Sequence, residues 1–427
     1  MTEQLTPGKN WQVILTLLAS ILGILLFAVQ AFSTGVAWLL FVLDSRMSFS
    51  QSMPIGLLFW TSILGGVLLL PLLLLSINQL RGKPSLTWLD LNHPVLAKAA
   101  RWVILIWPVV VLLGWLIARL ENVAVILLGP INILVAGIPI LWIYQAAQKG
   151  LAGGSQVRKW RVFGISIVML PFLVIVLELL AILILAGIGG IGLGFRINAN
   201  PQLEQQLLGL VEQLMMLDQD LDAILDFLKP LLLQPSVIFW GLAIFGGIAP
   251  IIEEVIKPLS LWPLAGRKIT PQEGFVGGLL CGAGFALMEN VLYFTNVINT
   301  EDWLIMAISR AGTGVLHMLA SGMMGWGLSR AWRDSKWLSL GLSALGAFVL
   351  HGFWNVLALI SGVAPLLILE AEPTFAQTLL SHLPVTLMLV LAVIGLILIN
   401  KHLRNEKPHP LAATESVHPE RHNQGNL

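Results

Sequence analysis

Ten long apolar stretches constrain most strongly what this chain can fold into. A helix needs about 20 apolar residues to cross the roughly 30 Å of hydrocarbon in a bilayer. Only 11% of the 427 residues are charged, against about a quarter in a typical soluble domain, so a water-soluble globular fold is excluded. The first stretch is longer than a signal-peptide core and lacks a clear cleavage site, so we expect it to be retained. We therefore expect an all-α, polytopic transmembrane helix bundle with spans at 12–41, 54–77, 102–118, 122–145, 162–190, 236–263, 274–298, 303–329, 337–361 and 383–400.

The charges between these stretches indicate the orientation of the chain. Gaps after even-numbered stretches are rich in cations, whereas gaps after odd-numbered stretches are mixed or acidic. Because cytoplasmic loops of membrane proteins carry the excess of Lys and Arg, we expect both termini in the cytoplasm. The cations on this side are Arg81, Lys83, Lys98, Arg101, Lys149, Arg158, Lys159, Arg161, Arg267, Lys268, Arg330, Arg333 and Lys336, followed by the tail from Lys401.

Composition divides the chain into five parts. Ionisable residues are almost absent from the first five spans and concentrated in four spans of the second half. From about residue 404 no apolar periodicity remains, which predicts a disordered tail. The single cysteine, Cys281, lies inside a span, so a disulfide framework is excluded. The expected parts are an N-terminal five-span bundle (1–195), an external amphipathic heptad helix (196–232), a four-span unit (233–361), an external loop with the last span (362–403) and the cytoplasmic tail (404–427).

The external segment has the spacing of a heptad helix. Its apolar residues recur at alternating intervals of four and three, which places them on one helix face. The opposite face is acidic, which argues against docking on anionic lipid. We expect one amphipathic helix that acts as a lid, as the seam of a homo-oligomer through 203–228, or as a linker packed on the protein's own surface. The apolar positions are Leu203, Leu207, Leu210, Leu214, Leu217, Leu221, Ile224 and Leu228.

Three charges lie together in the sixth stretch, where residues 250–258 read PIIEEVIKP. A charge at bilayer depth costs roughly 2.5–3.5 kcal/mol on insertion scales, so such groups persist when they are paired, hydrated or functional. Pro250 suits a first helical turn and predicts that a new helical piece begins inside the span. Glu253 and Lys257 are four residues apart on one helix face. We expect these two to pair and to leave Glu254 freer.

Each of the next three spans presents a polar stripe. Gly278 and Gly282 form a G-x-x-x-G pattern that lets a neighbouring backbone approach closely. The charged and imidazole side chains lie about 11 to 15 residues from the cytoplasmic ends of their spans, or roughly 17–23 Å at the helical rise. They therefore fall in one layer, where Glu289 and Arg310 can pair. The polar residues are Glu289 and Asn290 in the seventh span, Arg310 and His317 in the eighth, and His351 and Asn355 in the ninth.

This set of residues suits hydrolysis of an acyl group, most plausibly a peptide bond, inside the membrane. A partly dehydrated carboxylate can take a proton from water, and a second acid or a histidine can return it to a leaving amine. Histidine and asparagine donors could stabilise the developing oxyanion. Alternatively, Glu254, Glu289, His317 and His351 could hold one divalent metal such as zinc, which also activates water. The chain lacks H-E-x-x-H, so the choice between no cofactor and one metal stays open.

Four motifs in this unit resemble the PrsW family of intramembrane proteases, which is related to the CAAX prenyl protease and bacteriocin-processing group. They are EEVIK (253–257), FALMEN (285–290), HMLASG from His317, and HGFWN (351–355), and they cover about 236–361. The last motif, HGFWN, ends in asparagine. The CAAX group also has asparagine at this position, whereas PrsW patterns often have another polar residue.

The resemblance implies a role for each of these residues. Glu253 and Glu254 would activate the water, and Glu289, His317 and His351 would complete the catalytic site. Lys257, Arg310, Asn290 and Asn355 would support it. The resemblance also implies a multi-pass protein of the bacterial inner (cell) membrane, in contact with lipid, that cuts membrane-anchored proteins. No nucleic-acid partner is expected.

Two other functions compete with proteolysis. A transporter could use the same carboxylates as a proton or cation path, although the first half has no inverted repeat of the polar spans. A non-catalytic scaffold could assemble through the heptad segment. For Lys257 and Arg310, a purely electrostatic role as counter-ions to the buried carboxylates competes with a role in catalysis.

Overall fold

The computed structural model describes residues 10–43, 49–84, 86–217, 221–296, 300–368 and 374–406. Across these residues the chain is helical and contains no strand. Ten helical segments of this part are long and apolar enough to cross a membrane. The prediction of an all-α polytopic bundle is therefore confirmed. The cytoplasmic location of both termini stays a prediction, and most of the predicted tail, from residue 407, lies outside the described residues.

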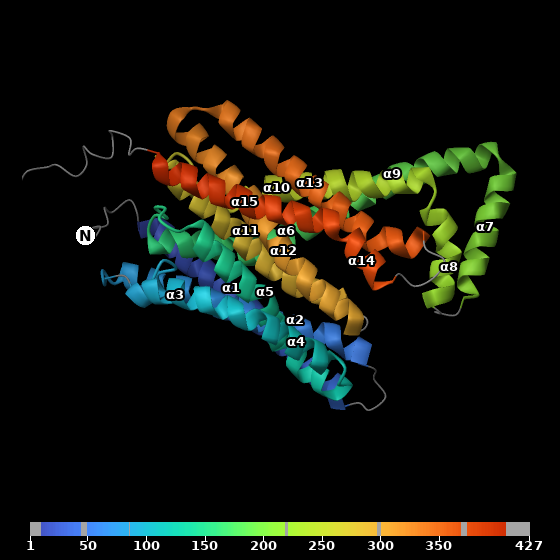
Figure 1. Cartoon of the computed structure of the whole chain (residues 1–427), viewed down its shortest axis with the longest axis horizontal. Helices are drawn as coiled ribbons and strands as arrows, with labels where there is room; N and C mark the ends of the chain where they lie inside the picture. The colour runs from blue at the N-terminus through green and yellow to red at the C-terminus, as the bar shows by residue number, and fades with distance from the viewer. Residues whose placement is uncertain are drawn as a thin grey trace, which may run out of the picture.

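The first half of the bundle consists of five spans (Figure 1). Its third span is composite, because a short 3-10 turn, η3 (Ile104–Ile106), joins two helices. α6 is much longer than a bilayer is thick and extends beyond the other spans to reach α7 (Figure 1). The elements are α1 (Asn10–Leu43), α2 (Phe49–Leu80), η2 (Thr87–Leu89), α3 (Pro94–Val103), α4 (Trp107–Ala118), α5 (Glu121–Ala147) and α6 (Gln156–Ala199).

The second half contributes the other five spans. Its sixth span is assembled from four short pieces, whereas the later spans are single helices. The elements are α9 (Pro235–Ala243), the π-helix η4 (Ile244–Ile248), α10 (Ala249–Ile256), the 3-10 helix η5 (Lys257–Leu264), α11 (Pro271–Tyr293), η6 (Phe294–Asn296), α12 (Thr300–Asp334), α13 (Trp337–Ile368), α14 (Phe375–Ser381) and α15 (Leu383–Asn405).

α11 forms the centre of the bundle. In its most apolar 18-residue window 89% of the residues are buried, a larger share than in any other described span. Its two glycines allow the closest contact, as the G-x-x-x-G pattern predicts: a Cβ at Gly278 would lie 2.1 Å from the Ser321 carbonyl oxygen, and one at Gly282 would lie 2.3 Å from that of His317. α12 therefore packs backbone to backbone on α11, and this contact fixes the position of His317.

The prediction of one continuous heptad helix is wrong. α7 (Pro201–Met215) ends in a turn at Met216 and Leu217, and α8 (Leu221–Leu232) is a separate helix. The sequence between them contains Asp218 and Asp220, and aspartate has a low helix propensity. The leucine seam is thus divided between two helices, which lie beyond the ends of the main bundle (Figure 1). The proposed roles as a lid or an oligomer seam stay predictions.

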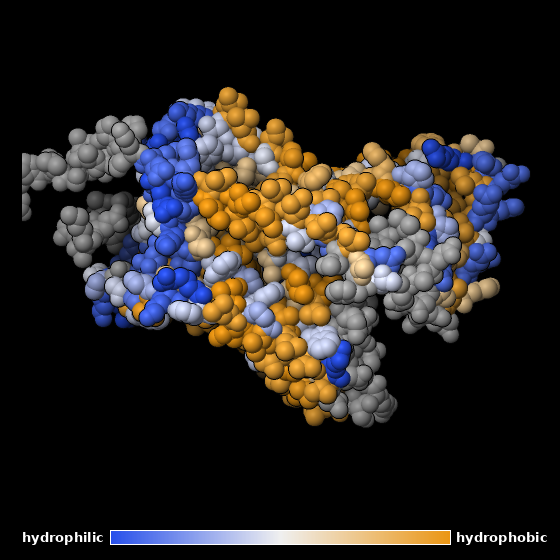
Figure 2. Space-filling view, in the orientation of Figure 1, coloured by the Kyte–Doolittle hydropathy of each residue, from blue (hydrophilic) through white to orange (hydrophobic). Residues whose placement is uncertain are grey.

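The surface of the bundle is polarised along its long axis. Hydrophilic side chains form a band at the end where α1 begins and α15 ends, and apolar side chains cover the helices beyond that band (Figure 2). The band contains ion pairs such as Arg158–Glu273 and Lys159–Asp90. This arrangement matches an apolar belt in the bilayer next to a cation-rich membrane surface.

Candidate functional site

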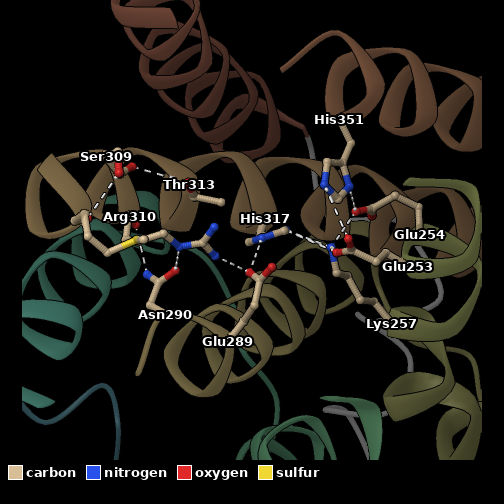
Figure 3. A network of polar contacts seen from close by, with 11 residues as sticks. Glu253, Glu254, Lys257, Glu289, Asn290, Ser309, Arg310, Thr313, His317 and His351 are labelled. Atoms are coloured by element: carbon tan, nitrogen blue, oxygen red, sulfur yellow. Dashed lines mark hydrogen bonds and ion pairs between the residues drawn. The ribbon is translucent and has the colours of Figure 1, made fainter. Parts of the chain in front are cut away.

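Four spans bring their ionisable side chains together in the interior of the bundle (Figure 3). The sixth span supplies two glutamates and a lysine, α11 supplies a glutamate, α12 an arginine and a histidine, and α13 a histidine. All five predicted catalytic residues therefore lie in one connected polar network. Its members are Glu253, Glu254, Lys257, Glu289, Arg310, His317 and His351.

The local structure of the sixth span explains how the glutamates reach this interior. As predicted, a new helical piece begins near Pro250: α10 starts at Ala249, directly after the π-helix η4. A proline has no N–H to donate, so the Gly246 carbonyl loses its normal helical donor. A Cβ at Gly352 would lie only 2.2 Å from this carbonyl oxygen, which shows how closely α13 approaches. The proline and the glycine thus place α10 next to His351.

Glu254 is fully buried and tightly held. Its Oε1 accepts a hydrogen bond of 2.7 Å from Lys257 Nζ and lies 2.9 Å from His351 Nδ1. Its Oε2 is buried and has no hydrogen-bond partner within the described part of the chain. A buried carboxylate oxygen without a donor is costly. This atom therefore marks a place for a cation or a water molecule.

Lys257 contacts both glutamates, so the expectation that it would leave Glu254 freer is wrong. Its Nζ lies 2.8 Å from Glu253 Oε2 and 2.7 Å from Glu254 Oε1. The reason is ordinary helix geometry: residues three and four positions earlier in α10 both neighbour the Lys257 side chain, so one lysine reaches both glutamates. The freer carboxylate is that of Glu253, which is 6% exposed and whose Oε1 no described hydrogen bond holds.

His317 connects the two ends of the network. Its Nδ1 lies 2.7 Å from Lys257 Nζ, and its Nε2 lies 2.8 Å from Glu289 Oε2. Because a lysine ammonium can only donate, Nδ1 accepts and the proton lies on Nε2, which donates to Glu289. Phe285 packs edge-on against this ring at 5.3 Å between centroids. His317 is therefore fixed in both orientation and tautomer.

The predicted pair of Glu289 and Arg310 is confirmed. Arg310 Nη2 lies 2.5 Å from Glu289 Oε2, and Arg310 Nε donates to Asn290 Oδ1 at 2.8 Å. Asn290 Nδ2 in turn donates to the Arg310 carbonyl at 2.9 Å. The guanidinium also lies over the ring of Tyr293, 4.0 Å from its centroid, a contact that the sequence pattern did not indicate. Arg310 thus neutralises and fixes the glutamate that orients His317.

His351 leaves one nitrogen available. Its Nδ1 faces the Glu254 carboxylate, which can only accept, so Nδ1 carries the proton and Nε2 carries the lone pair. This lone pair lies 3.8 Å from Glu253 Oε1. Two acceptors that face each other at this distance need a donor or a cation between them. The gap between Glu253 and His351 is therefore a position that a donor or a cation could fill.

Asn355 does not reach the charged network. Its Nδ2 donates 3.0 Å to the Phe245 carbonyl oxygen in η4, where the π-helix interrupts the normal hydrogen-bond ladder. It therefore stabilises the irregular segment before α10. Cys281, predicted as a core residue, lies at 2.8 Å from the Lys257 carbonyl and is buried beside the site.

Four of the side chains could hold a metal ion. One ligand atom from each of Glu253, Glu254, His317 and His351 lies within 4.8 Å of the others, and all four residues are buried. Two carboxylates and two imidazoles suit zinc and similar divalent ions. The predicted ligand set differs by one residue, because Glu289 binds Arg310 and His317 and Glu253 takes its place. Two observations support this fit. Glu254 Oε2 has no hydrogen-bond partner among the described residues, and each histidine has one ring nitrogen bonded to a carboxylate, as metal-binding histidines usually have.

An apolar groove lies beside this network. Its volume is about 410 Å³, and it runs between η4 and α13, where Gly246, Ile251, Val349, Gly352 and Val356 contribute to its lining. Ile251 is two residues from Glu253, and Gly352 is next to His351. The groove is thus lined by the same two elements, α10 and α13, that carry Glu253 and His351.

These features define an integral, multi-pass membrane protein with a buried carboxylate–imidazole centre. Residues 206–394 match the family model described as PrsW family intramembrane metalloprotease, so this part of the chain is similar to that family. By class it is thus an intramembrane protease, and the predicted resemblance is confirmed. The match extends beyond the four motifs at both ends and includes α8, most of α7 and part of α15. No curated protein and no solved structure matches the chain.

Proposed function

We propose that the protein hydrolyses a peptide bond of a membrane-anchored protein with water that Glu253 and Glu254 activate. The observation that supports this most is the buried glutamate pair within the segment that matches the protease family: Glu254 is hydrogen-bonded to His351, and Glu253 Oε2 lies 4.0 Å from His317 Nδ1. Intramembrane proteolysis is the class that the family gives. The water, the peptide substrate and a place in the bacterial inner membrane are our proposals.

Within the site we assign Glu253 as the general base. Glu254 is held by Lys257 and His351, whereas Glu253 Oε1 faces the open gap toward His351 Nε2. The water oxygen adds to the substrate carbonyl carbon as Glu253 takes its proton. The C–N bond then breaks, and the proton passes from Glu253 to the leaving nitrogen. Glu289 acts as a positioning residue, because it reaches the gap only through His317.

The residues also fit a metalloprotease. Glu253, Glu254, His317 and His351 would hold the ion, which when bound polarises the substrate carbonyl and the attacking water. Lys257 Nζ lies within 2.8 Å of both carboxylates and of His317 Nδ1, so in this structure the ammonium is the cation that balances the glutamates. A divalent ion and this ammonium would compete for the same donors.

The groove beside η4 and α13 supports access from the lipid. Phe245, Val349 and Phe353 near it are exposed large apolar residues, which suits a surface that faces hydrocarbon. The apolar lining would accept the membrane-embedded segment of a substrate and direct its backbone toward Glu253. Gly247 in the lining has open space where a Cβ would lie, which lets another backbone come close to this part of the groove.

The test is cleavage of a membrane-anchored reporter by the full-length protein in proteoliposomes. Glu253→Gln and Glu254→Gln keep the shape of the side chains but remove the negative charge, and each is expected to reduce cleavage by at least 100-fold, in line with loss of general base catalysis. Glu406→Gln, at the end of α15 and away from the network, is the matched control and keeps full activity. Cleavage at the wild-type rate by either site variant would contradict the proposal. Proton flux measured on the same vesicles separates proteolysis from transport.

A further inference from the structure

A second cavity lies outside the catalytic network. Its volume is about 370 Å³, and it is formed by α1, α2, α6 and the end of η5. The side chains at one end are polar and those at the other end are apolar. Trp11, Gln12 and Arg161 line the polar end, and Ala19 and Met169 line the apolar end.

Two cations without carboxylate partners lie at the polar end: Arg161 lines it, and Arg267 donates to the lining residue Gln12. Arg161 has a buried Nε with no hydrogen-bond partner, and no ion pair of its guanidinium occurs among the described residues. The nearest charges are the like charges of Arg267 and Arg158. Arg158 is neutralised by Glu273 at 2.7 Å, whereas Arg267 donates to the neutral Gln12. Two positive charges, Arg161 and Arg267, are therefore available to one anion.

The rest of the cavity is apolar. Thr16 and Ser20 face it, but both hydroxyls donate to carbonyls of their own helix, at 2.7 and 2.5 Å. Leu69, Leu72 and Val168 form the remaining wall. From Arg161 to Met169 the lining extends eight residues along α6, or roughly 12 Å at the helical rise. This part of the cavity therefore suits a hydrocarbon chain.

The polar end also lies at the level expected for a membrane surface. It is at the start of α1 and α6, the end of the molecule at which Figure 2 shows a hydrophilic band. Trp11, at the mouth, is 60% exposed, as is common for tryptophan at the boundary between headgroups and hydrocarbon. Arginines at the cytoplasmic surface meet the leaflet that is rich in anionic lipid.

We propose that this cavity binds one anionic phospholipid. The phosphate would lie between Arg161 and Arg267, and an acyl chain would fill the space along α1 and α6. A free phosphate ion would leave the apolar end unused, and a zwitterionic lipid would leave the excess positive charge unbalanced. The site is independent of the Glu/His network, although Pro263 in its wall belongs to η5, which begins at Lys257. A bound lipid would thus contact the element that carries this lysine.

The experiment measures lipid binding to the purified full-length protein in neutral detergent by native mass spectrometry. Phosphatidylglycerol is expected to bind, and Arg161→Gln and Arg267→Gln are each expected to weaken binding about fivefold, as the loss of one membrane-proximal cation predicts. Ala19 is an exposed residue at the apolar end of the cavity. Ala19→Phe is therefore expected to fill this end and also to weaken phosphatidylglycerol binding. Arg101→Gln removes an exposed cation at the end of α3, outside the cavity, and leaves binding unchanged.

Three results would overturn the proposal. Equal binding of phosphatidylcholine and phosphatidylglycerol would show that the arginines do not select an anion. Displacement of the lipid by millimolar inorganic phosphate, with no effect of Ala19→Phe, would indicate a phosphate site. Unchanged phosphatidylglycerol binding in Arg161→Gln and Arg267→Gln would exclude the site itself. Size-exclusion chromatography shows whether each variant is folded, and Ala19→Phe keeps the test decisive if an arginine variant is not.

Discussion

At the scale of single residues, Lys257 determines the electrostatic balance of the catalytic network. It is fully buried and binds two carboxylates and an imidazole, and the ring of Phe285 lies 4.5 Å from its Nζ. Removing one partner of a buried ionic group strongly destabilises a protein, because the remaining charge is left uncompensated. The same lysine shields the donors that a metal ion would need.

This balance predicts that a metal can replace Lys257. Lys257→Met should lower stability by about 3–5 kcal/mol in the presence of a chelator, because two adjacent carboxylates lose their counter-ion. Zinc should then restore stability and bind more tightly than to the wild type. Thermal unfolding in detergent, with chelator or with zinc, measures both effects. Lys149→Met, an exposed lysine between α5 and α6, is the control. If zinc stabilises the wild type but not Lys257→Met, the proposed competition between zinc and the Lys257 ammonium is refuted.

At the proposed metal site Glu289 would act indirectly, because it contacts His317 and is not among the four residues that could hold the ion. Carboxylates that orient a metal-binding histidine typically contribute 10- to 100-fold to metal affinity. Glu289→Gln is therefore expected to weaken zinc binding by about this factor, whereas Glu254→Gln removes a ligand and abolishes tight binding. Equilibrium dialysis with metal analysis measures the difference. Equal loss in the two variants would show that Glu289 is itself a ligand.

At the scale of elements, the contact between α11 and α12 holds the site together. Gly278 and Gly282 let the two backbones touch, and His317 lies at the point of contact. Sequence reasoning could predict this approach because G-x-x-x-G has a direct steric meaning. The spacing of Lys257 from Glu253 and Glu254 allows a contact with either glutamate, but spacing alone could not show that both contacts form. Nor could the seam of leucines show where α7 ends, since Leu217, itself a seam position, lies in the turn that ends the helix.

The glycine contact predicts a large difference between two Gly→Ala variants. In Gly282→Ala the new methyl group would meet the His317 carbonyl at 2.3 Å, so α12 must move and the protein should lose about 1–3 kcal/mol together with cleavage activity. Gly192→Ala, in α6, meets nothing within 4 Å and should leave both properties unchanged. Thermal unfolding and the reporter assay check the pair. Full activity in Gly282→Ala would mean that the position of His317 is not critical.

At the scale of the whole molecule, the number of spans and the layer of polar residues follow from the sequence because a bilayer allows few alternatives. Apolar length predicts the helices, and the cost of buried charge predicts that Glu253, Glu289, His317 and His351 meet. The pairwise contacts within that layer depend on local helix geometry and were only partly predictable. The domain boundaries, with 233–361 as the catalytic unit, remain our proposal.

The orientation of the bundle is the remaining whole-molecule prediction, and the chain offers a direct way to measure it. Its one cysteine, Cys281, is fully buried, so a membrane-impermeant maleimide should not label the wild type. The cation-rich end contains Lys98 and Lys401, and α7 at the opposite end contains Glu212. By the positive-inside rule, Lys98→Cys and Lys401→Cys should react only after permeabilisation, whereas Glu212→Cys should react in intact cells. The reverse pattern would place the cation-rich end outside, and with it the lipid cavity in the outer leaflet.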